Sequence, residues 1–227
     1  MASALINGLL QQGYLAKQLH VVEINAESRE KIKDIFGVSA LADLESGVID
    51  TDVIVLSVKP QHLHDLTQQL SPFLKRQLII SIVAGIRVGD IARWLGGYLR
   101  IVRTMPNTPS SIQCGVTGLY AAASVSEEDR KIAESILTAV GLTLWVEDEE
   151  MLHAVTAISG SGPAYVFYFI ESLQKAAAAL GLSSEEAKQL SLQTFVGASK
   201  LASLSDKDIA ILREQVTSKG GTTEQAI

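Results

Sequence analysis

The chain has 227 residues, 47% of them hydrophobic and 19% charged, which is typical of a globular protein with a substantial core and excludes a disordered chain. Its formal net charge of −6, without a basic block, argues against nucleic acid as the main partner. The single cysteine, Cys114, excludes an internal disulfide and a thiolate metal cluster, and we expect no metal. No apolar run approaches the length of a membrane span, so we expect a cytoplasmic protein without a membrane partner.

The first two thirds of the chain alternate between helical and strand-like patterns. Apolar residues recur at helical spacing over residues 1–13, and three near-continuous β-branched runs are typical of strands buried on both faces of a parallel sheet. The predicted strands cover residues 21–24, 52–58, 78–83, 99–104, 115–121 and 142–146. The predicted helices between them cover residues 27–36, 60–74, 88–95 and 126–141. The alternation predicts a doubly wound α/β domain.

From residue 147 onward the sequence predicts no further strand. The expected helices cover residues 149–158, 164–180, 184–203 and 206–216. This change of pattern predicts a domain boundary near Asp148, with an α/β domain over 1–148 and a helical domain over 149–227.

Three loops follow predicted strands of the α/β domain at the ends where ligands bind in doubly wound sheets. They contain Ser57-Val58-Lys59-Pro60, then Ala84-Gly85, and then Asn107 between two prolines. Each can also be an ordinary turn, because a lysine at a strand end is usually solvated and Asn-Thr-Pro is a turn former. The three loops together are candidates for a ligand site.

The start of the chain lacks a feature of dinucleotide-binding domains. Such domains open with a strand and a G-x-G-x-x-G/A loop, which places a pyrophosphate on a helix N-terminus. The helix at Met1 fits the one that follows this loop, with Ala2 at its last small position. We therefore expect that the first strand and glycine loop are absent from this sequence, and that the chain binds a cofactor poorly or not at all.

Two glycine-rich segments stand in the predicted helical domain. Ser159-Gly160-Ser161-Gly162-Pro163 separates two helices, and its small residues suit close approach to a polar ligand. Thr217-Ser218-Lys219-Gly220-Gly221-Thr222-Thr223 precedes a further helix, whose free N–H groups favour an anion. The alternatives are a helix–helix corner for the first segment and a helix stop with a threonine cap for the second.

Taken in order along the chain, these motifs closely resemble the Δ1-pyrroline-5-carboxylate reductase family over essentially all 227 residues. The resemblance implies reduction of a cyclic imine, 1-pyrroline-5-carboxylate, to L-proline by a nicotinamide cofactor. It also implies a Rossmann-like NAD(P)-binding domain over 1–148 and a helical dimerisation and substrate-binding domain over 149–227. The family forms an intertwined homodimer, often assembled further into a decamer, and continues past Ile227 with another helix. The motifs that carry the resemblance are Met1-Ala2, Val58-Lys59-Pro60, Arg103 to Pro109, Ser159 to Tyr165 and Thr217 to Thr223.

The resemblance also assigns roles to residues of the substrate site. Backbone N–H groups of Gly221, Thr222 and Thr223 are expected to bind the substrate carboxylate. The Thr223 hydroxyl is the expected partner of the ring nitrogen and the candidate proton donor. Glu149 is expected to face the substrate across the dimer interface, and Ser161 and Thr156 to line the pocket.

NADPH is the preferred cofactor, with NADH also expected to work. Asn25, Ser28 and Arg29, just past the second strand of the domain, favour the 2′-phosphate of NADP over the ribose hydroxyls of NAD. The expected cofactor-binding residues are Met1, Ala2, Asn25, Ser28, Arg29, Ser57, Val58, Lys59, Pro60, Gly85 and Asn107.

Two other function classes stay open at this point. A reductase of β-hydroxy or keto acids would use a helix-borne lysine, but Lys175, Lys188 and Lys200 stand neither beside an asparagine nor in a glycine-flanked segment. A truncated, non-catalytic cofactor-domain scaffold would explain the missing glycine loop but not the intact segment at Thr217 to Thr223.

Overall fold

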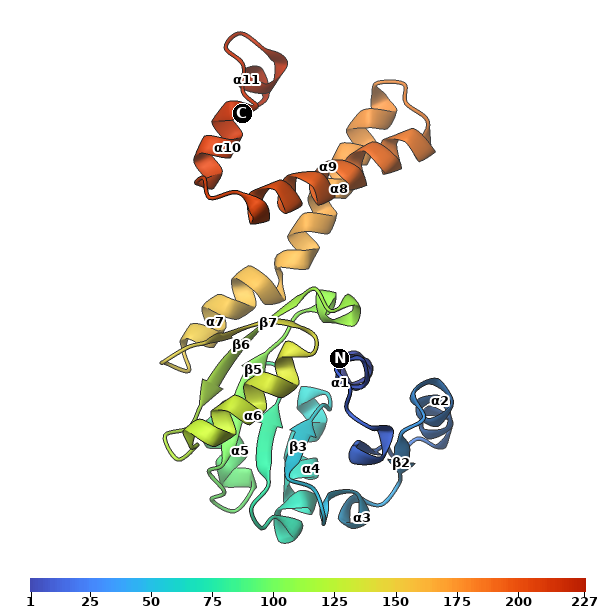
Figure 1. Cartoon of the computed structure of the whole chain (residues 1–227), viewed down its shortest axis with the longest axis vertical. Helices are drawn as coiled ribbons and strands as arrows, with labels where there is room; N and C mark the ends of the chain where they lie inside the picture. Colours follow the sequence, from blue (N-terminus) through green and yellow to red (C-terminus); the bar gives the residue numbers. More distant parts are fainter. The chain divides into compact units, whose positions relative to one another are not determined.

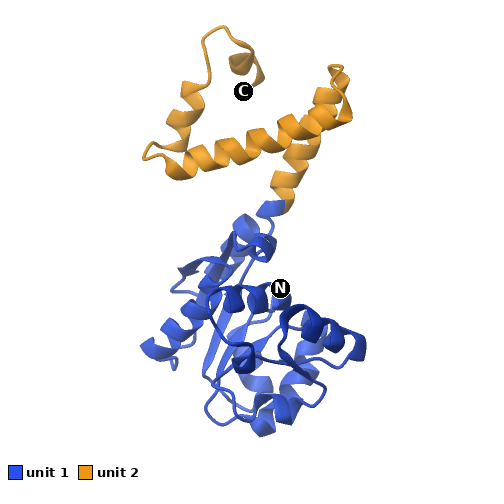
Figure 2. Cartoon of the chain, turned by 45° about the vertical axis from the view of Figure 1, so that its right-hand side comes forward, with its two compact units in different colours: residues 1–163 blue, residues 164–227 orange.

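The computed structural model describes all 227 residues as two compact units, Met1–Pro163 and Ala164–Ile227 (Figure 2). The first unit contains every strand, and the second consists of helices and their connections. The predicted alternation of helices and strands is confirmed. None of the helices combines the length and the apolar character that a membrane crossing requires.

The first unit contains seven strands and the helices between them (Figure 1). The strands are β1 (His20–Val22), β2 (Ser39–Leu41), β3 (Val53–Leu56), β4 (Leu78–Ser81), β5 (Ile101–Met105), β6 (Gly115–Ala121) and β7 (Gly141–Trp145). The helices are α1 (Ala2–Gln11), α2 (Ala26–Phe36), α3 (Leu44–Val48), α4 (Pro60–Leu70), α5 (Val88–Trp94), α6 (Glu127–Thr138) and α7 (Met151–Val155).

The main sheet has the order β3-β4-β5-β6-β7, in which β3, β4 and β5 are parallel. β6 runs antiparallel to β5, and β7 is parallel to β6. The reversal at β6 departs from a fully parallel arrangement. The connection from β5 to β6 consists of residues 106–114 and includes the 3₁₀ turn Thr108–Ile112, and so short a segment cannot carry a crossover helix.

β1 and β2 form a separate two-stranded parallel sheet. The sequence prediction missed β2 and α3, because a three-residue strand and a five-residue helix are too short to show a periodicity. The strand predicted over residues 52–58 is shorter, Val53–Leu56, and packs on both faces, but it is only partly buried: Val53 and Val55 contact one core cluster and Ile54 the other. Within β3 only Leu56 is buried, because β3 is an edge strand of the main sheet and pairs with β4 alone.

The core of the first unit lies on both faces of the main sheet, as the β-branched runs predict for β4 and β5. Leu78 and Ile80 point to one face, where they pack with apolar residues of α1 and α6. Ile79 points to the other face and packs with residues of α4 and α5. This alternation follows from the two-residue repeat of a strand. The carboxyl ends of β3, β4 and β5 are thereby held at one edge of a rigid sheet.

The predicted helix over residues 149–158 is divided in the structure. α7 ends at Val155, and a π-helical turn follows over Thr156–Gly160. Single π-helical turns occur often at functional sites. Ser161 ends the turn, and α8 (Gly162–Ala179) begins directly after it.

The second unit contains most of α8 and three further helices: α9 (Ser184–Leu204), α10 (Ile209–Gln215) and α11 (Thr222–Ala226). α9 begins with a capping box, in which Ser183 and Glu186 satisfy each other's backbone N–H groups. Ala187 and Ser191 are the only buried residues of this unit. A helical unit with so few buried side chains exposes the faces that would otherwise form its core.

Candidate functional site

Residues after β3 form an exposed segment at the carboxyl edge of the sheet. Ser57, Lys59 and Pro60 are exposed and Val58 is half-buried. Pro60 is the first residue of α4, and no side chain caps that helix. The segment is therefore accessible to a ligand, although Pro60 has no N–H and the His62 N–H already donates to the Lys59 carbonyl oxygen at 2.9 Å.

Gly85 stands after β4 at the same edge. Its φ of +79° lies in the region that favours glycine, and a Cβ built on it would meet nothing within 4 Å. Backbone conformation, rather than crowding by protein atoms, therefore requires the glycine here. The open space beside it suits close approach of a ligand to the backbone.

Asn107, after β5, bridges two other segments of the first unit. Its Nδ2 donates a hydrogen bond to the carbonyl oxygen of Ser159 at 3.1 Å, and its Oδ1 accepts one from Val116 N–H at 2.9 Å. The side chain thus ties the loop after β5 to the π-helical turn and to β6. The loop after β5 and the Ser159-Gly160-Ser161 segment, predicted as separate candidates, lie side by side in the structure.

The π-helical turn packs closely against β5. A Cβ on Gly160 would lie 2.7 Å from Cε of Met105, so this glycine permits the close approach. Thr156 donates its hydroxyl hydrogen to the Leu152 carbonyl, and its own carbonyl accepts a hydrogen bond from Ser161 N–H. The predicted pocket residues Thr156 and Ser161 are therefore joined to each other through the backbone.

Glu149 lies against the sheet, 18% exposed. Its Oε1 accepts hydrogen bonds from Nη1 of Arg103 and from the backbone N–H of Val88, both at 2.8 Å. The sequence analysis selected Glu149 but gave Arg103 no role. Its position inside a buried strand is the signal that could have marked it, because a buried arginine requires an anionic partner.

The remaining cofactor candidates lie near the start of the chain. The side chain of Asn25 accepts from Ser28 N–H and caps α2, while Arg29 donates to the carbonyl oxygens of Glu23 and Ile24. The structure therefore brings Asn25, Ser28 and Arg29 into one turn. Met1 is the N-cap residue of α1, and no side chain caps this helix. The N–H group of Ala2 is therefore without a side-chain partner. α1 is also in contact with α2.

The threonine segment belongs to the second unit. Gly221 is the N-cap residue of α11, and Thr222 and Thr223 form its first turn, as predicted. The Gly221 N–H already donates to the carbonyl oxygen of Ser218 at 2.9 Å. In this conformation only Thr222 and Thr223 offer free N–H groups, which is a correction to the expectation that all three do so together.

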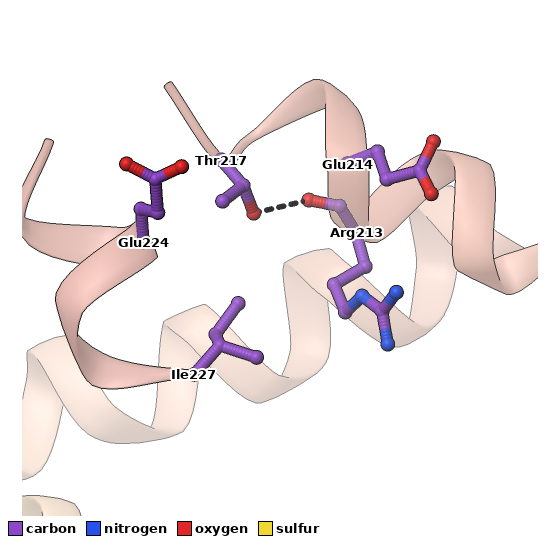
Figure 3. A pocket seen from close by; sticks show the side chains of 5 residues that line it. All are labelled: Arg213, Glu214, Thr217, Glu224 and Ile227. Carbon is purple, nitrogen blue, oxygen red and sulfur yellow. Dashed lines mark hydrogen bonds between the residues drawn. The ribbon is translucent and has the colours of Figure 1, made fainter. Parts of the chain in front are cut away.

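A shallow hollow of about 260 Å³ lies between α10 and α11 (Figure 3). On its α10 side the Thr217 hydroxyl donates to the Arg213 carbonyl, four residues earlier, at 2.7 Å. Neither Thr222 nor Thr223 lines the hollow, so it is not the predicted substrate site. Its lining residues are Arg213, Glu214, Thr217, Glu224 and Ile227.

A doubly wound sheet with accessible loops at the carboxyl ends of its strands, followed by a helical region with exposed apolar faces, is the arrangement expected of dinucleotide-dependent oxidoreductases with a helical second domain. Residues 1–85 match the family model described as "NADP oxidoreductase coenzyme F420-dependent". Residues 149–227 match the model described as "Pyrroline-5-carboxylate reductase dimerisation". The chain belongs to the pyrroline-5-carboxylate reductase family.

Relatives of known family are similar to this chain over nearly its whole length. The chain is 46% identical to a pyrroline-5-carboxylate reductase of Pseudomonas aeruginosa, over 100% of this chain and 84% of that protein. The structure of a pyrroline-5-carboxylate reductase from Coxiella burnetii matches with a TM-score of 0.93 at 41% identity, covering 99% of this chain and 84% of that one. The structure of the Plasmodium falciparum enzyme with NADP bound matches with a TM-score of 0.87 at 30% identity, covering 99% and 83%.

Proposed function

We propose that this protein reduces 1-pyrroline-5-carboxylate to L-proline with NADPH, the last step of proline biosynthesis. The observation that carries the proposal is the 46% identity to a pyrroline-5-carboxylate reductase over the whole chain, which includes both halves of the fold. The positions of the motif residues agree with this role, because the loops after β3, β4 and β5 converge at one edge of the sheet.

The cofactor is proposed to lie along that edge. The residues present fit a dinucleotide, since the space beside Gly85 is open and α1 and α4 begin without side-chain caps. Ser57 to Pro60, Gly85 and Asn107 would meet the nicotinamide end, and the turn at Asn25, Ser28 and Arg29 the 2′-phosphate. Bound NADPH supplies the hydride, and NADH is proposed as a weaker substitute.

The substrate site is proposed to form across the dimer interface from two segments. The free backbone N–H groups of Thr222 and Thr223, which follow the N-cap residue Gly221, bind the carboxylate, and the Thr223 hydroxyl holds the ring nitrogen and passes it a proton. Glu149, Thr156 and Ser161 line the pocket. The protein's own contribution is orientation and proton supply rather than a nucleophile.

We also propose a separate role for each domain and an oligomeric state for the protein. Residues 1–148 bind the cofactor and residues 149–227 bind the substrate and form a homodimer, which can assemble further into a decamer. Exposed apolar residues on α8, α9 and α10 support the dimer. The proposed location is the cytoplasm.

The function is tested by following NADPH oxidation with 1-pyrroline-5-carboxylate, and separately with a keto acid and a β-keto acid. The assay is run on the 227-residue chain and on a version preceded by a strand and a G-x-G-x-x-G/A loop, and NADPH binding is measured for both. Turnover of the imine alone is expected. Turnover of a keto acid alone would establish the competing reductase, and NADPH binding without any turnover would establish the non-catalytic scaffold.

A further inference from the structure

The Glu149 carboxylate joins three elements of the first unit. Glu149 stands just ahead of α7, and its Oε1 accepts one hydrogen bond from Arg103 of β5 and one from the N–H of Val88, the first residue of α5. Both donors lie 2.8 Å away, at sequence separations of 46 and 61 residues. One oxygen atom thus connects β5, the start of α5 and the entry to α7.

This contact constrains its partners because Arg103 is buried. The Arg103 side chain is 5% exposed, and Glu149 is the one carboxylate with which it forms an ion pair. A buried cation without an anion is strongly unfavourable, so the guanidinium holds Glu149 in place.

The start of α5 depends on the same oxygen. Arg87, the N-cap residue of α5, makes no side-chain cap hydrogen bond. Glu149 instead accepts the hydrogen bond from the first N–H group of the helix, that of Val88, 61 residues earlier in the chain. The loop that leads from β4 to α5 contains Gly85 and ends at this capped turn. The conformation of that loop is therefore anchored at its far end by Glu149.

We propose that Arg103 and Glu149 are positioning residues for the nicotinamide cofactor. Their ion pair holds the first turn of α5, and through it the Gly85 loop, in the shape that accepts the cofactor. The π-helical turn that carries Thr156 and Ser161 has a separate anchor, the hydrogen bond from Asn107 to the Ser159 carbonyl, so the ion pair acts on the Gly85 loop. The inference deepens the proposed function and gives Glu149 a task besides lining the substrate site.

Hydrogen exchange tests the anchor without reference to any reaction. We expect Glu149→Ala and Arg103→Met to raise the deuterium uptake of the Val88 amide and of peptides over residues 82–90 by about tenfold or more. Glu149→Gln keeps an acceptor for the Val88 N–H but removes the charge that neutralises Arg103, so it should restore protection only in part. The matched control is Glu150→Gln, which breaks only the exposed pair of Glu150 with Arg87 on the same two elements and should change nothing. Unchanged uptake in both Glu149→Ala and Arg103→Met would overturn the proposal.

Kinetics then separate positioning from direct substrate contact. Arg103→Met and Glu149→Ala should each raise KM for NADPH about tenfold, and the double variant should be no worse than the poorer single one. Arg103→Met should leave KM for the imine within about twofold of the parent value. A general loss of structure would instead raise KM for NADPH and KM for the imine together. An effect of Glu149→Ala on the imine alone, with Arg103→Met like the parent, would contradict the proposal.

A substitute variant and a binding measurement cover the cases in which a variant does not fold or the chain does not reduce the imine. Arg103→Gln, which removes the charge but keeps a polar side chain, replaces Arg103→Met if that variant does not fold, with the same expected result. If the chain does not reduce the imine, the proposed function fails by itself, and the positioning role is judged by hydrogen exchange and by fluorescence titration with NADPH. NADPH affinity equal to that of the parent in both single variants would then refute it.

Discussion

Asn107 and Glu149 show how single side chains connect segments that the sequence presents separately. Asn107 uses both ends of its amide inside the chain, and Glu149 uses one oxygen for two donors. Each residue therefore fixes backbone beside the candidate site. Whether either also touches a ligand stays a prediction, whereas their contacts within the chain follow directly from the geometry.

Thr223 provides the most direct residue-level prediction. Thr223→Ala should lower kcat for imine reduction about 10- to 100-fold, because a hydrogen bond to a group that becomes charged is lost. Thr223→Ser keeps the hydroxyl and should retain most of the rate. Steady-state kinetics with saturating NADPH measure both variants, and full kcat in Thr223→Ala would remove the residue from the catalytic role.

Asp129 predicts how stability depends on pH. Two hydrogen bonds from Arg100, at 2.8 and 2.5 Å, together with one from Ser126, lower the pKa of the buried Asp129 carboxyl from its ordinary value of 3.8. A depressed pKa stabilises the fold above the unfolded-state value, and this stabilisation is lost as pH falls through the folded-state value. Asp129→Asn should therefore cost about 1–3 kcal/mol at pH 7 and progressively less below about pH 4.

Urea unfolding of the parent and of Asp129→Asn across this pH range measures the difference. Asp65→Asn is a suitable control, since its side chain is 77% exposed and contacts only His64. A cost that is the same at pH 3 and pH 7 would show that the ion pair is not the cause.

At the scale of elements, α7 lies directly over β6. A Cβ on Gly118 of β6 would come within 2.8 Å of Cγ1 of Val155 in α7 and within 3.1 Å of Cδ2 of Leu152. The glycine therefore sets the distance between helix and strand, and with it the height of the π-helical turn above the sheet.

Gly118→Ala should accordingly destabilise the protein by about 1–3 kcal/mol, as overpacking of a core contact does. Combining it with Val155→Ala should recover part of the loss, because the clashing methyl group is removed. Gly89→Ala is the control, since a Cβ there meets nothing within 4 Å. Urea midpoints give the comparison, and a Gly118→Ala variant as stable as the parent would show that α7 can shift freely.

Helices and strands whose apolar residues recur at regular spacing were predictable from the sequence. Contacts between residues far apart in the chain were not. β4, α5, β6 and α6 lie close to their predicted bounds, since their apolar spacing and the Ser126 cap are local signals. The reversal of β6, the edge position of β3 and the Arg103–Glu149 pair depend on tertiary arrangement. For the same reason the sequence indicated the candidate site segments but not the hydrogen bond from Asn107 to Ser159.

At the scale of the whole molecule, the second unit requires a partner for its apolar surface. Val166, Phe169 and Leu173 form an exposed stripe at helical spacing on α8, and Phe169 is 60% exposed. The match of residues 149–227 to a dimerisation model supports the proposal that this partner is a second copy of the chain.

Phe169→Asp should shift the protein from dimer to monomer at micromolar concentration, because a charge in an apolar interface is not solvated there. Lys131→Asp, an exposed change on α6 of the first unit, is the control and should leave the dimer intact. Sedimentation velocity distinguishes the species. A Phe169→Asp variant that remains fully dimeric would place the interface elsewhere.

The central claim, that the protein transfers hydride from NADPH to the imine carbon of 1-pyrroline-5-carboxylate, is tested most directly by isotope transfer. NADPH carrying deuterium at the transferable position is incubated with the imine and the homodimer, and the product is analysed by mass spectrometry and NMR. The account predicts L-proline with one deuterium at the former imine carbon for each NADPH consumed. Unlabelled proline, or deuterium in a different product, would contradict it.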